Sequence, residues 1–423
     1  MSSLNSPRQI AVEGLIKVTQ SGGYSNLVLN ALLEESNLKN EDKSFCTAIF
    51  YGTLDRMVTV DYYLKKLIKT PLKKVKPYTL AVLRTAVYQI KYMSKVPVSA
   101  AVNEAVKLIK NSNESFNASF VNAVLRNLAR TEIPLPNGNS IYDISVTYSC
   151  ANWIVSVLVE DYGVEFTKDF LNNAINPPPL FARVNTLKVT AEELLKVLKE
   201  EDVSAKILSD TALLLNASSP QNTNAYKNGL FFIQDLSCQK AIEMLDIKED
   251  SLVLDLCAAP GGKSFSAAIK APKGRVVACD LYEQRASLIK KGTKRLGAEN
   301  IEVYTADATE FKEELGLFDR IICDVPCSGL GVIRRKPDIK YKQENSFEEL
   351  AEIQQKILNN ASRYLKKGGK LLYSTCTLNK KENGKNVEIF LKNNPKFSLV
   401  SEKTFSYQTE NSDGFYAAVI QKN

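Results

Sequence analysis

The carboxyl-terminal part of the chain alternates short apolar segments with longer amphipathic ones. From about residue 235 the short segments have strand length, and the long ones repeat apolar residues at helical spacing. This alternation predicts a parallel, doubly wound α/β sheet. The expected strands are 252–256, 275–279, 301–304, 319–323 and 370–374. One helix is expected to begin near Lys263, and further helices are expected at 283–296, 346–366 and about 380–394. A terminal hairpin is expected around 414–420.

Aspartate or cysteine residues lie at the ends of several of these expected strands. Right-handed crossovers bring the carboxyl ends of parallel strands to one edge of the sheet, where ligands bind. We therefore expect one edge to gather Cys257, Asp280, Asp307, Asp324 and Cys376.

A turn of small residues follows the first of these strands, and its sequence is DLCAAPGGK at 255–263. Small residues let a ligand approach the backbone, and the next helix offers unpaired amides. The turn is neither a dinucleotide GxGxxG motif nor a phosphate loop. Asp280 lies 18 residues beyond Gly262, a position that suits a ribose diol, and Asp307 could meet an adenine edge. This set favours S-adenosylmethionine, a nucleoside without phosphate; the alternative is that both acids only cap helices.

Two thiols follow the turn, Cys327 in DVPCSG and Cys376 in STCT. The chain has no histidine, which removes every Ser-His or Cys-His arrangement. A general base must then be a carboxylate, lysine, tyrosine, thiolate or water. The eight cysteines are scattered and form no CxxC pair, so we expect neither a disulfide framework nor a metal site. Cys257, Cys279 and Cys323 are expected to pack in the core, and the backbone of Cys257 to line the cofactor.

The amino-terminal third has a helical pattern with breaks at prolines. Helices are expected over 6–130, and after a linker at 131–140 another helical stretch covers 141–175. A small α+β unit follows, with strands at 181–187, 204–208, 212–214 and 230–233 and a helix at 190–201. These patterns predict a multidomain chain with domains at 1–132, 140–232 and 233–423.

The positive charge is concentrated in the helical third. Residues 1–130 carry 18 Lys and Arg against 9 Asp and Glu, whereas the remainder carries 37 against 38. An imbalance over a whole domain indicates a polyanion such as nucleic acid. Its densest part comprises Lys65, Lys66, Lys69, Lys73, Lys74 and Lys76. No apolar run approaches the ~18–20 residues that span a bilayer, and no signal-peptide core opens the chain. We therefore expect a cytoplasmic protein with no membrane partner.

Three motifs, in order, resemble the NOL1/NOP2/Sun family of RNA cytosine-C5 methyltransferases. They are the 255–263 turn, the Pro-Cys segment 324–329 with RRKPD at 334–338, and STCT at 374–377. The helical third is similar to NusB, an RNA-binding antitermination factor. The matching stretches there are 51–54, 82–84, 96–106 and 120–126. The resemblance implies an all-α NusB-like domain, a small α+β RNA-recognition unit and a Rossmann-like class I methyltransferase with a seven-stranded, mostly parallel sheet.

The resemblance also implies an activity: methyl transfer from S-adenosylmethionine to carbon 5 of a cytosine in 16S ribosomal RNA. Carbon 5 is a poor nucleophile until a thiolate adds at carbon 6, and cysteine both attacks and leaves well. By resemblance, Cys376 attacks and Cys327 assists release; chemistry alone leaves the two roles open. Asp324 would contact the cytosine edge or help hold the cofactor, and Lys263 could lower the thiol pKa. The implied cofactor residues are Cys257, Ala258, Ala259, Pro260, Gly261, Gly262, Lys263, Asp280, Asp307 and Asp324.

The target base must leave any stack to reach two thiols, so single-stranded or loop RNA, or an early small-subunit particle, is the expected partner. Arg334, Arg335 and Lys336 could hold flanking phosphates; the alternative is that they only form a solvated loop. The alternatives are a non-catalytic RNA-binding factor for ribosome assembly or antitermination, and a DNA cytosine methyltransferase. The sequence does not fix the oligomeric state, and a monomer is the working expectation.

Overall fold

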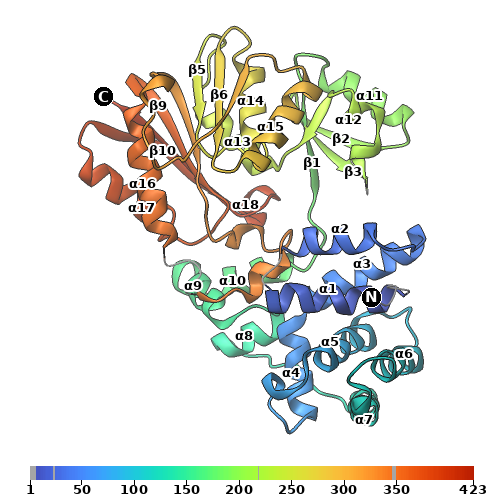
Figure 1. Ribbon diagram of the computed structural model, residues 1–423. Coiled ribbons are helices and arrows are strands. Elements are labelled where there is room, and N and C mark those ends of the chain that lie inside the picture. Colours follow the sequence, from blue (N-terminus) through green and yellow to red (C-terminus); the bar gives the residue numbers. More distant parts are fainter. Residues whose placement is uncertain (1–5, 22–23, 218, 345–348) are drawn as a thin grey trace. The chain divides into compact units, whose positions relative to one another are not determined.

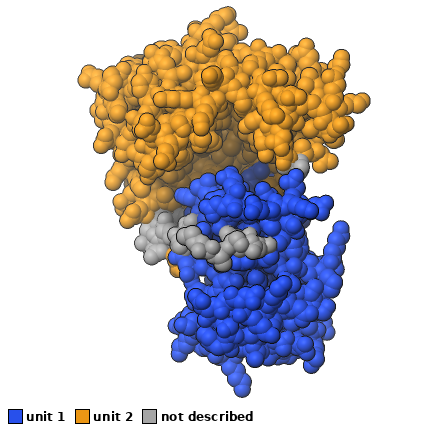
Figure 2. Space-filling model, turned by 45° about the vertical axis from the view of Figure 1, so that its right-hand side comes forward, with its two compact units in different colours: residues 1–176, 333–342 blue, residues 177–332, 343–423 orange. Residues whose placement is uncertain are grey.

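The computed structural model describes residues 6–21, 24–217, 219–344 and 349–423. They form two compact units, which Figure 2 shows in different colours. Unit 1 comprises residues 1–176 and 333–342, and unit 2 comprises 177–332 and 343–423. The expected start of a helix at 346–348 and the first five residues lie outside the described parts. The three expected domains remain a prediction.

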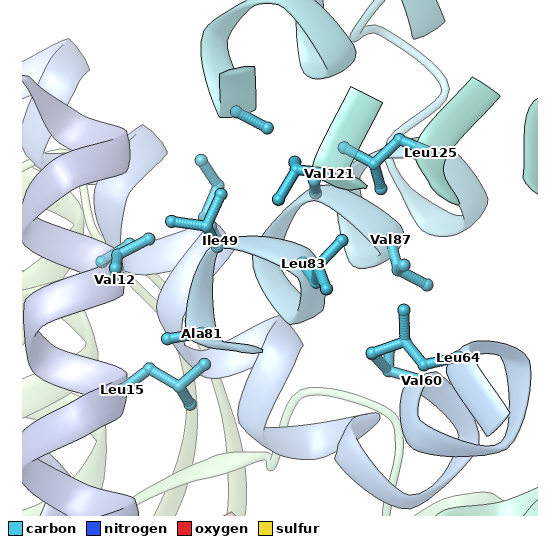
Figure 3. Close-up of a cluster of buried hydrophobic side chains, with 14 of the residues drawn as sticks. Val12, Leu15, Ile49, Val60, Leu64, Ala81, Leu83, Val87, Val121 and Leu125 are labelled. Atoms are coloured by element: carbon cyan, nitrogen blue, oxygen red, sulfur yellow. The ribbon is translucent and has the colours of Figure 1, made fainter. Parts of the chain in front are cut away.

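Unit 1 is all-helical, as expected. Its first seven helices pack around an apolar core formed by side chains such as Leu15, Ile49, Leu83 and Leu125, which Figure 3 shows pointing toward one another. These helices are α1 (Pro7–Ser21), α2 (Ser25–Glu34), α3 (Asn40–Asp55), α4 (Met57–Leu67), α5 (Pro77–Tyr92), α6 (Val98–Lys110) and α7 (Ala118–Arg130).

The expected single stretch 141–175 is divided into three helices. They are α8 (Ile141–Tyr148), α9 (Asn152–Tyr162) and α10 (Val164–Asn173). The first ends at Ser149, whose φ of 55° is left-handed, and the second ends at Gly163, with φ 84°. A left-handed residue ends a helix because it cannot continue the right-handed hydrogen-bond ladder. The hydrophobic spacing of this stretch therefore predicted the helical state correctly but not its two breaks.

A segment that follows the Pro-Cys motif by only a few residues belongs to unit 1. Residues 333–342 contain the short 3₁₀ helix η6 (Pro337–Tyr341). The buried ammonium of Lys340 lies 2.5 Å from the Asp55 carboxylate. Ser25 donates a hydrogen bond of 2.6 Å to Asp338, and the indole of Trp153 donates to the Lys342 carbonyl at 2.9 Å. This segment is thus tied to helices that lie far from it in the sequence.

Unit 2 contains a small antiparallel sheet in the order β2-β3-β1-β4. Its strands are β1 (Leu180–Val184), β2 (Ser204–Ser209), β3 (Ala212–Asn216) and β4 (Phe231–Ile233), with helices α11 (Ala191–Glu200) and α12 (Asn224–Lys227). Helix α11 begins with a capping box, in which Thr190 accepts from the Glu193 amide and Glu193 accepts from the Thr190 amide. The expected α+β unit is confirmed.

The large sheet of unit 2 has seven strands in the order β10-β11-β9-β8-β5-β6-β7 (Figure 1). The strands are β5 (Leu252–Asp255), β6 (Arg275–Asp280), β7 (Ile301–Thr305), β8 (Phe318–Asp324), β9 (Leu365–Thr375), β10 (Phe397–Phe405) and β11 (Phe415–Lys422). Strands β5 to β9 pair in parallel, whereas β11 pairs antiparallel with β9 and β10. The seven-stranded, mostly parallel sheet is confirmed.

The prediction of a terminal hairpin around residues 414–420 is wrong in its details. Residues 415–422 form one strand, β11, and the other arm of the hairpin is β10. The short helix α18 (Tyr407–Glu410) joins them. Most β10 side chains are exposed, so the strand lacks the apolar alternation that marks a half-buried strand in a sequence. The remaining helices of this unit are α13 (Leu236–Met244), α14 (Gly262–Lys270), α15 (Glu283–Leu296), α16 (Leu350–Arg363) and α17 (Gly384–Asn393).

Candidate active site

The parallel strands end along one edge of the large sheet, as expected. In the register of β8 and β9, Asp324 lies beside Ser374, and in that of β5 and β6, Asp255 lies beside Ala278. This pairing brings the Pro-Cys segment after β8 next to the Thr-Cys segment after β9. The sheet therefore places Cys327 and Cys376 together although they are 49 positions apart.

The two thiols are in direct contact. Their sulfur atoms lie 3.2 Å apart, and the backbone amide of Cys376 donates to the sulfur of Cys327 at 3.3 Å. The hydrogen bond with Cys376, followed by burial, raises the pKa of Cys327 well above its usual value, and the charges of Cys376, Glu382 and Asp324 add to the effect. Two adjacent buried thiols do not both ionise readily. The contact therefore favours at most one thiolate in the pair at a time.

Lys263, at the start of α14, points its ammonium at the end of β8. It forms an ion pair of 2.6 Å with Asp324, whose other oxygen accepts from the Ser374 hydroxyl at 2.8 Å. Burial disfavours the charge of Lys263, but the interactions with Asp324, Cys238 and Asp255 together outweigh burial and raise the pKa of the ammonium above its ordinary value. Lys263 is therefore a fixed positive charge. Its ammonium contacts Asp324 and the sulfur of Cys238, at 3.8 Å, and among the described residues it forms no hydrogen bond with the two thiols of the motifs.

A cavity of about 190 Å³ opens beside this ion pair. It is lined by Gln234, Asp235, Cys238, Asp255, Cys257, Ala258, Ala259, Pro260, Gly262, Lys263 and Asp324. Two buried polar atoms in its lining, Oδ1 of Asp255 and Nε2 of Gln234, have no hydrogen-bond partner among the described residues. The small residues of the turn and these two polar atoms fit a ligand that carries both donors and acceptors, as S-adenosylmethionine does.

Asp255 is the most strongly perturbed carboxyl of the cavity. Burial raises its pKa to about 7, although the Ser264 hydroxyl, which donates to it at 2.6 Å, acts in the opposite direction. A buried carboxyl with a raised pKa beside a cavity is a candidate functional group. Its position at the end of β5 was visible in the sequence, but the sequence gives no measure of its burial.

Asp280 and Asp307 lie at the expected edge but outside the cavity lining. Asp280 is 3% exposed, and its carboxylate accepts from the amides of Ala259 and Tyr282 at 3.2 and 3.3 Å. One oxygen of Asp307 accepts from the amide and the hydroxyl of Thr309. In both cases the carboxylate accepts from nearby backbone amides, as expected if these acids only cap the segments that follow them. Contact of either acid with a cofactor therefore stays a prediction.

The other cysteines of unit 2 differ in burial: some are buried in the core and others line the cavity. Cys279 and Cys323 are fully buried in their strands, which confirms core packing. Cys257 is only half-buried, and it both packs against the core and lines the cavity. Cys238 on α13 also lines the cavity, and the sequence analysis missed it because α13 precedes the recognised motifs. Among the described residues, no cluster of acids and cysteines could hold a metal, and no helix is long and apolar enough to cross a membrane.

Comparisons with known proteins cover nearly the whole chain. Family models match in three places: the NusB family over residues 5–130, an RsmF/B-like ferredoxin-like domain over 151–221, and 16S rRNA methyltransferase RsmB/F over 242–421. A probable ribosomal RNA small subunit methyltransferase B of Bacillus subtilis is 38% identical, and the match covers 93% of this chain and 89% of that protein. A probable methyltransferase B of Synechocystis is 30% identical, with 91% and 89% covered.

Solved structures share the same architecture. The crystal structure of PH0851 matches with a TM-score of 0.83 and 25% identity, covering 98% of this chain and 99% of that one. NSun6 from Pyrococcus horikoshii, solved with SFG, matches with a TM-score of 0.58 and 21% identity, covering 63% of this chain and 97% of that one. At this identity the second likeness shows the fold alone.

The sheet order, the small-residue turn and the matched models together define a class I methyltransferase domain that depends on S-adenosylmethionine, preceded by a NusB-like domain and a ferredoxin-like domain. The resemblance found in the sequence is thereby confirmed. The chain belongs to the family of ribosomal RNA small subunit methyltransferase B.

Proposed function

We propose that this protein methylates carbon 5 of a cytosine in 16S ribosomal RNA through a covalent adduct between a cysteine and carbon 6. The observation that carries the proposal is the contact of two thiols, 3.2 Å apart, at the carboxyl ends of adjacent parallel strands. Cytosine carbon 5 needs a thiolate at carbon 6 to become nucleophilic, and the thiolate must leave afterwards. A pair of thiols beside a cofactor cavity supplies both an attacker and a second acid–base group.

In this mechanism Cys376 attacks carbon 6, which makes carbon 5 electron-rich. S-adenosylmethionine supplies an electrophilic methyl group when bound. In the proposal the Cys327 thiol, 3.2 Å away, donates a hydrogen bond to the Cys376 thiolate before attack. After transfer, the Cys327 sulfur, which gives up its own proton to solvent once Cys376 is bound to the base, takes the proton from carbon 5. The carbon 6–sulfur bond then breaks with its electron pair returning to Cys376 as a thiolate, which restores the ring. We assign Cys327 to this release step, as the resemblance implied.

Asp324 and Lys263 act as a pair in the proposal. Lys263 holds one carboxylate oxygen of Asp324 and Ser374 holds the other, so the carboxyl has a fixed orientation at the end of β8. From there it can face the polar edge of a flipped cytosine. The proposed cofactor residues are those of the 257–263 turn with Asp280, Asp307 and Asp324. Of these, the turn residues other than Gly261 line the cavity together with Asp324.

The test is a transfer assay with defined RNA. The purified protein is incubated with methyl-labelled S-adenosylmethionine and unmodified 16S ribosomal RNA, both naked and in small-subunit particles, and the nucleosides are identified by mass spectrometry. We expect 5-methylcytidine from RNA and none from DNA of the same sequence. Labelled product at another atom would overturn the proposed chemistry. RNA binding with no transfer to either substrate would instead support the non-catalytic assembly factor.

We also propose that the helical unit binds RNA through its lysine cluster. Lys65, Lys69 and Lys73, like the rest of the cluster, are exposed. A lysine that contacts a phosphate releases counterions, so replacing these three by alanine should lower the slope of log affinity against log salt by about 0.7 for each lost contact to single-stranded RNA. Filter binding at several salt concentrations measures the slope. The matched control replaces the exposed lysines Lys367, Lys392 and Lys396, which lie at the end of the large sheet opposite the two thiols. Equal slopes for both triple variants would contradict a specific role of the cluster.

A further inference from the structure

A buried carboxylate outside the recognised motifs contacts the Pro-Cys segment directly and is linked to the Thr-Cys segment through the Ser328 hydroxyl. Glu382 lies between the end of β9 and the start of α17, and it is only 3% exposed. One of its oxygens accepts from the Ser328 amide and from Gln354 Nε2, each at 2.9 Å. The other accepts from the Ser328 hydroxyl and from Asn379 Nδ2, the latter at 3.1 Å. Four donors thus occupy the four acceptor positions of a carboxylate.

Two of these donors belong to Ser328, and the other two hold the chain around the thiols. Ser328 adjoins Cys327, and Gln354 on α16 also donates to the carbonyl of Pro326 at 2.9 Å, so both flanks of Cys327 are held. On the other side, the hydroxyl of Thr377, which adjoins Cys376, lies 2.7 Å from the hydroxyl of Ser328. A carboxylate can only accept, so Ser328 donates its proton to Glu382 and must accept from Thr377. Glu382 therefore sets the direction of a hydrogen-bond chain that joins the two thiol segments.

We infer that Glu382 is a positioning residue that holds Cys327 and Cys376 in contact. The inference rests on the proposed function, because contact of the thiols matters only if both take part in the reaction. The chemistry requires a carboxylate at this place. A glutamine would present an NH₂ group to one pair of these donors, and no rotamer of its amide satisfies all four. Glu382 does not line the cofactor cavity, so its effect should be on the thiols and not on cofactor binding.

The distance between the sulfurs can be measured without RNA. Diamide oxidises two neighbouring thiols to a disulfide: each thiol loses one hydrogen, and the azo bond of diamide takes up both to become a hydrazine. Mass spectrometry of the linked 327 and 376 peptides gives the rate of this reaction. We expect Glu382→Gln to slow disulfide formation about tenfold or more. We also expect the variant to lose about a hundredfold in kcat, because a misplacement of about 1 Å costs that much. KM for S-adenosylmethionine should change less than about threefold.

The matched control is Asp319→Asn. Asp319 is another carboxylate of β8, at the opposite end of the strand, and it accepts from the Leu252 amide at 3.0 Å and from Lys366 at 2.9 Å. Its loss should leave the disulfide rate unchanged. If folded Glu382→Gln, judged by calorimetric binding of S-adenosylmethionine, forms the disulfide as fast as this control, the inference is overturned.

If Glu382→Gln does not fold, a second variant tests whether Glu382 holds the two thiols in contact. Ser328→Ala keeps the amide that donates to Glu382 and removes only the hydroxyl that links Glu382 to Thr377. The inference predicts slower disulfide formation in this variant too, whereas a wild-type rate overturns it. Because the oxidation needs neither RNA nor methyl transfer, this result stays distinct from any failure of the proposed function. Restoration of the rate by Glu382→Asp, relative to Glu382→Gln, would show that the acceptor chemistry is what matters.

Discussion

Replacement of Cys376 by alanine should abolish methyl transfer, and replacement of Cys327 by alanine should trap the protein on its RNA. The first change removes the only attacking atom of the proposed mechanism, so we expect kcat to fall on the order of 10⁴-fold or more. The second leaves the attacker in place and removes the group assigned to release. Attack and methyl transfer then proceed, and the adduct accumulates instead of turning over.

The asymmetry between the two variants follows from the proposed roles of the thiols. The adjacent sulfurs do not both ionise readily, and in the proposal the negative charge lies on the Cys376 sulfur, to which Cys327 donates. Removing Cys327 withdraws one donor to that thiolate, which slows attack but does not prevent it. Removing Cys376 leaves the Cys327 sulfur with the amide of residue 376 as a donor but with no partner thiol.

Denaturing gels measure this prediction, since a covalent protein–RNA adduct migrates more slowly than free protein. We expect a shifted band with Cys327→Ala, none with Cys376→Ala, and labelled RNA only with the wild type. Cys46→Ala is the matched control, because Cys46 is a fully buried cysteine of the helical core and should keep full transfer. An adduct with Cys376→Ala and none with Cys327→Ala would reverse the roles.

The residues at the catalytic edge of the sheet could be predicted from the sequence, because local pattern and topology define where parallel strands end. Alternation placed Asp324 and Cys376 at one edge of the sheet, and the register shows in addition that their strands are neighbours. The partners of Lys263 were not predictable: a lysine in a turn can reach several groups, and only the fold shows that it pairs with Asp324. Glu382 was missed for the same reason, since a loop carboxylate has no periodicity that would reveal its burial.

Residues 333–342 were the part of the active-site sequence that was hardest to interpret. The run of Arg334, Arg335 and Lys336 suggested a solvated loop or a phosphate contact. Lys336 is exposed and the two arginines are half-buried, but the residues directly after them are buried in unit 1. A charged residue such as Lys340 is almost never fully buried unless it is paired, and its partner Asp55 lies 285 positions away. Pairing over such a separation leaves no trace in local pattern.

The second large prediction concerns the Lys340–Asp55 ion pair. Removing the carboxylate should lower the stability of unit 1 more than removing the ammonium. Asp55→Ala should destabilise unit 1 by about 3 kcal/mol, because it leaves a fully buried ammonium without its carboxylate. Lys340→Met should cost clearly less. Methionine fills a similar volume with apolar atoms, and Asp55 is 20% exposed and keeps Arg56 at 3.7 Å. The double variant should be more stable than Asp55→Ala alone, since the stranded charge is gone.

Hydrogen exchange of peptides from α3, which ends at Asp55, is the appropriate measurement. A chain of several domains does not unfold in one step, so a single midpoint would mix the two units. At a difference of about 3 kcal/mol, exchange that proceeds through unfolding of this unit should accelerate roughly a hundredfold in Asp55→Ala. Lys273→Ala is the control: it removes an exposed ion pair with Glu249 and should leave α3 unchanged. Equal protection of α3 in Asp55→Ala and Lys340→Met would contradict the prediction, because the cost would then come from losing the pair and not from stranding a buried charge.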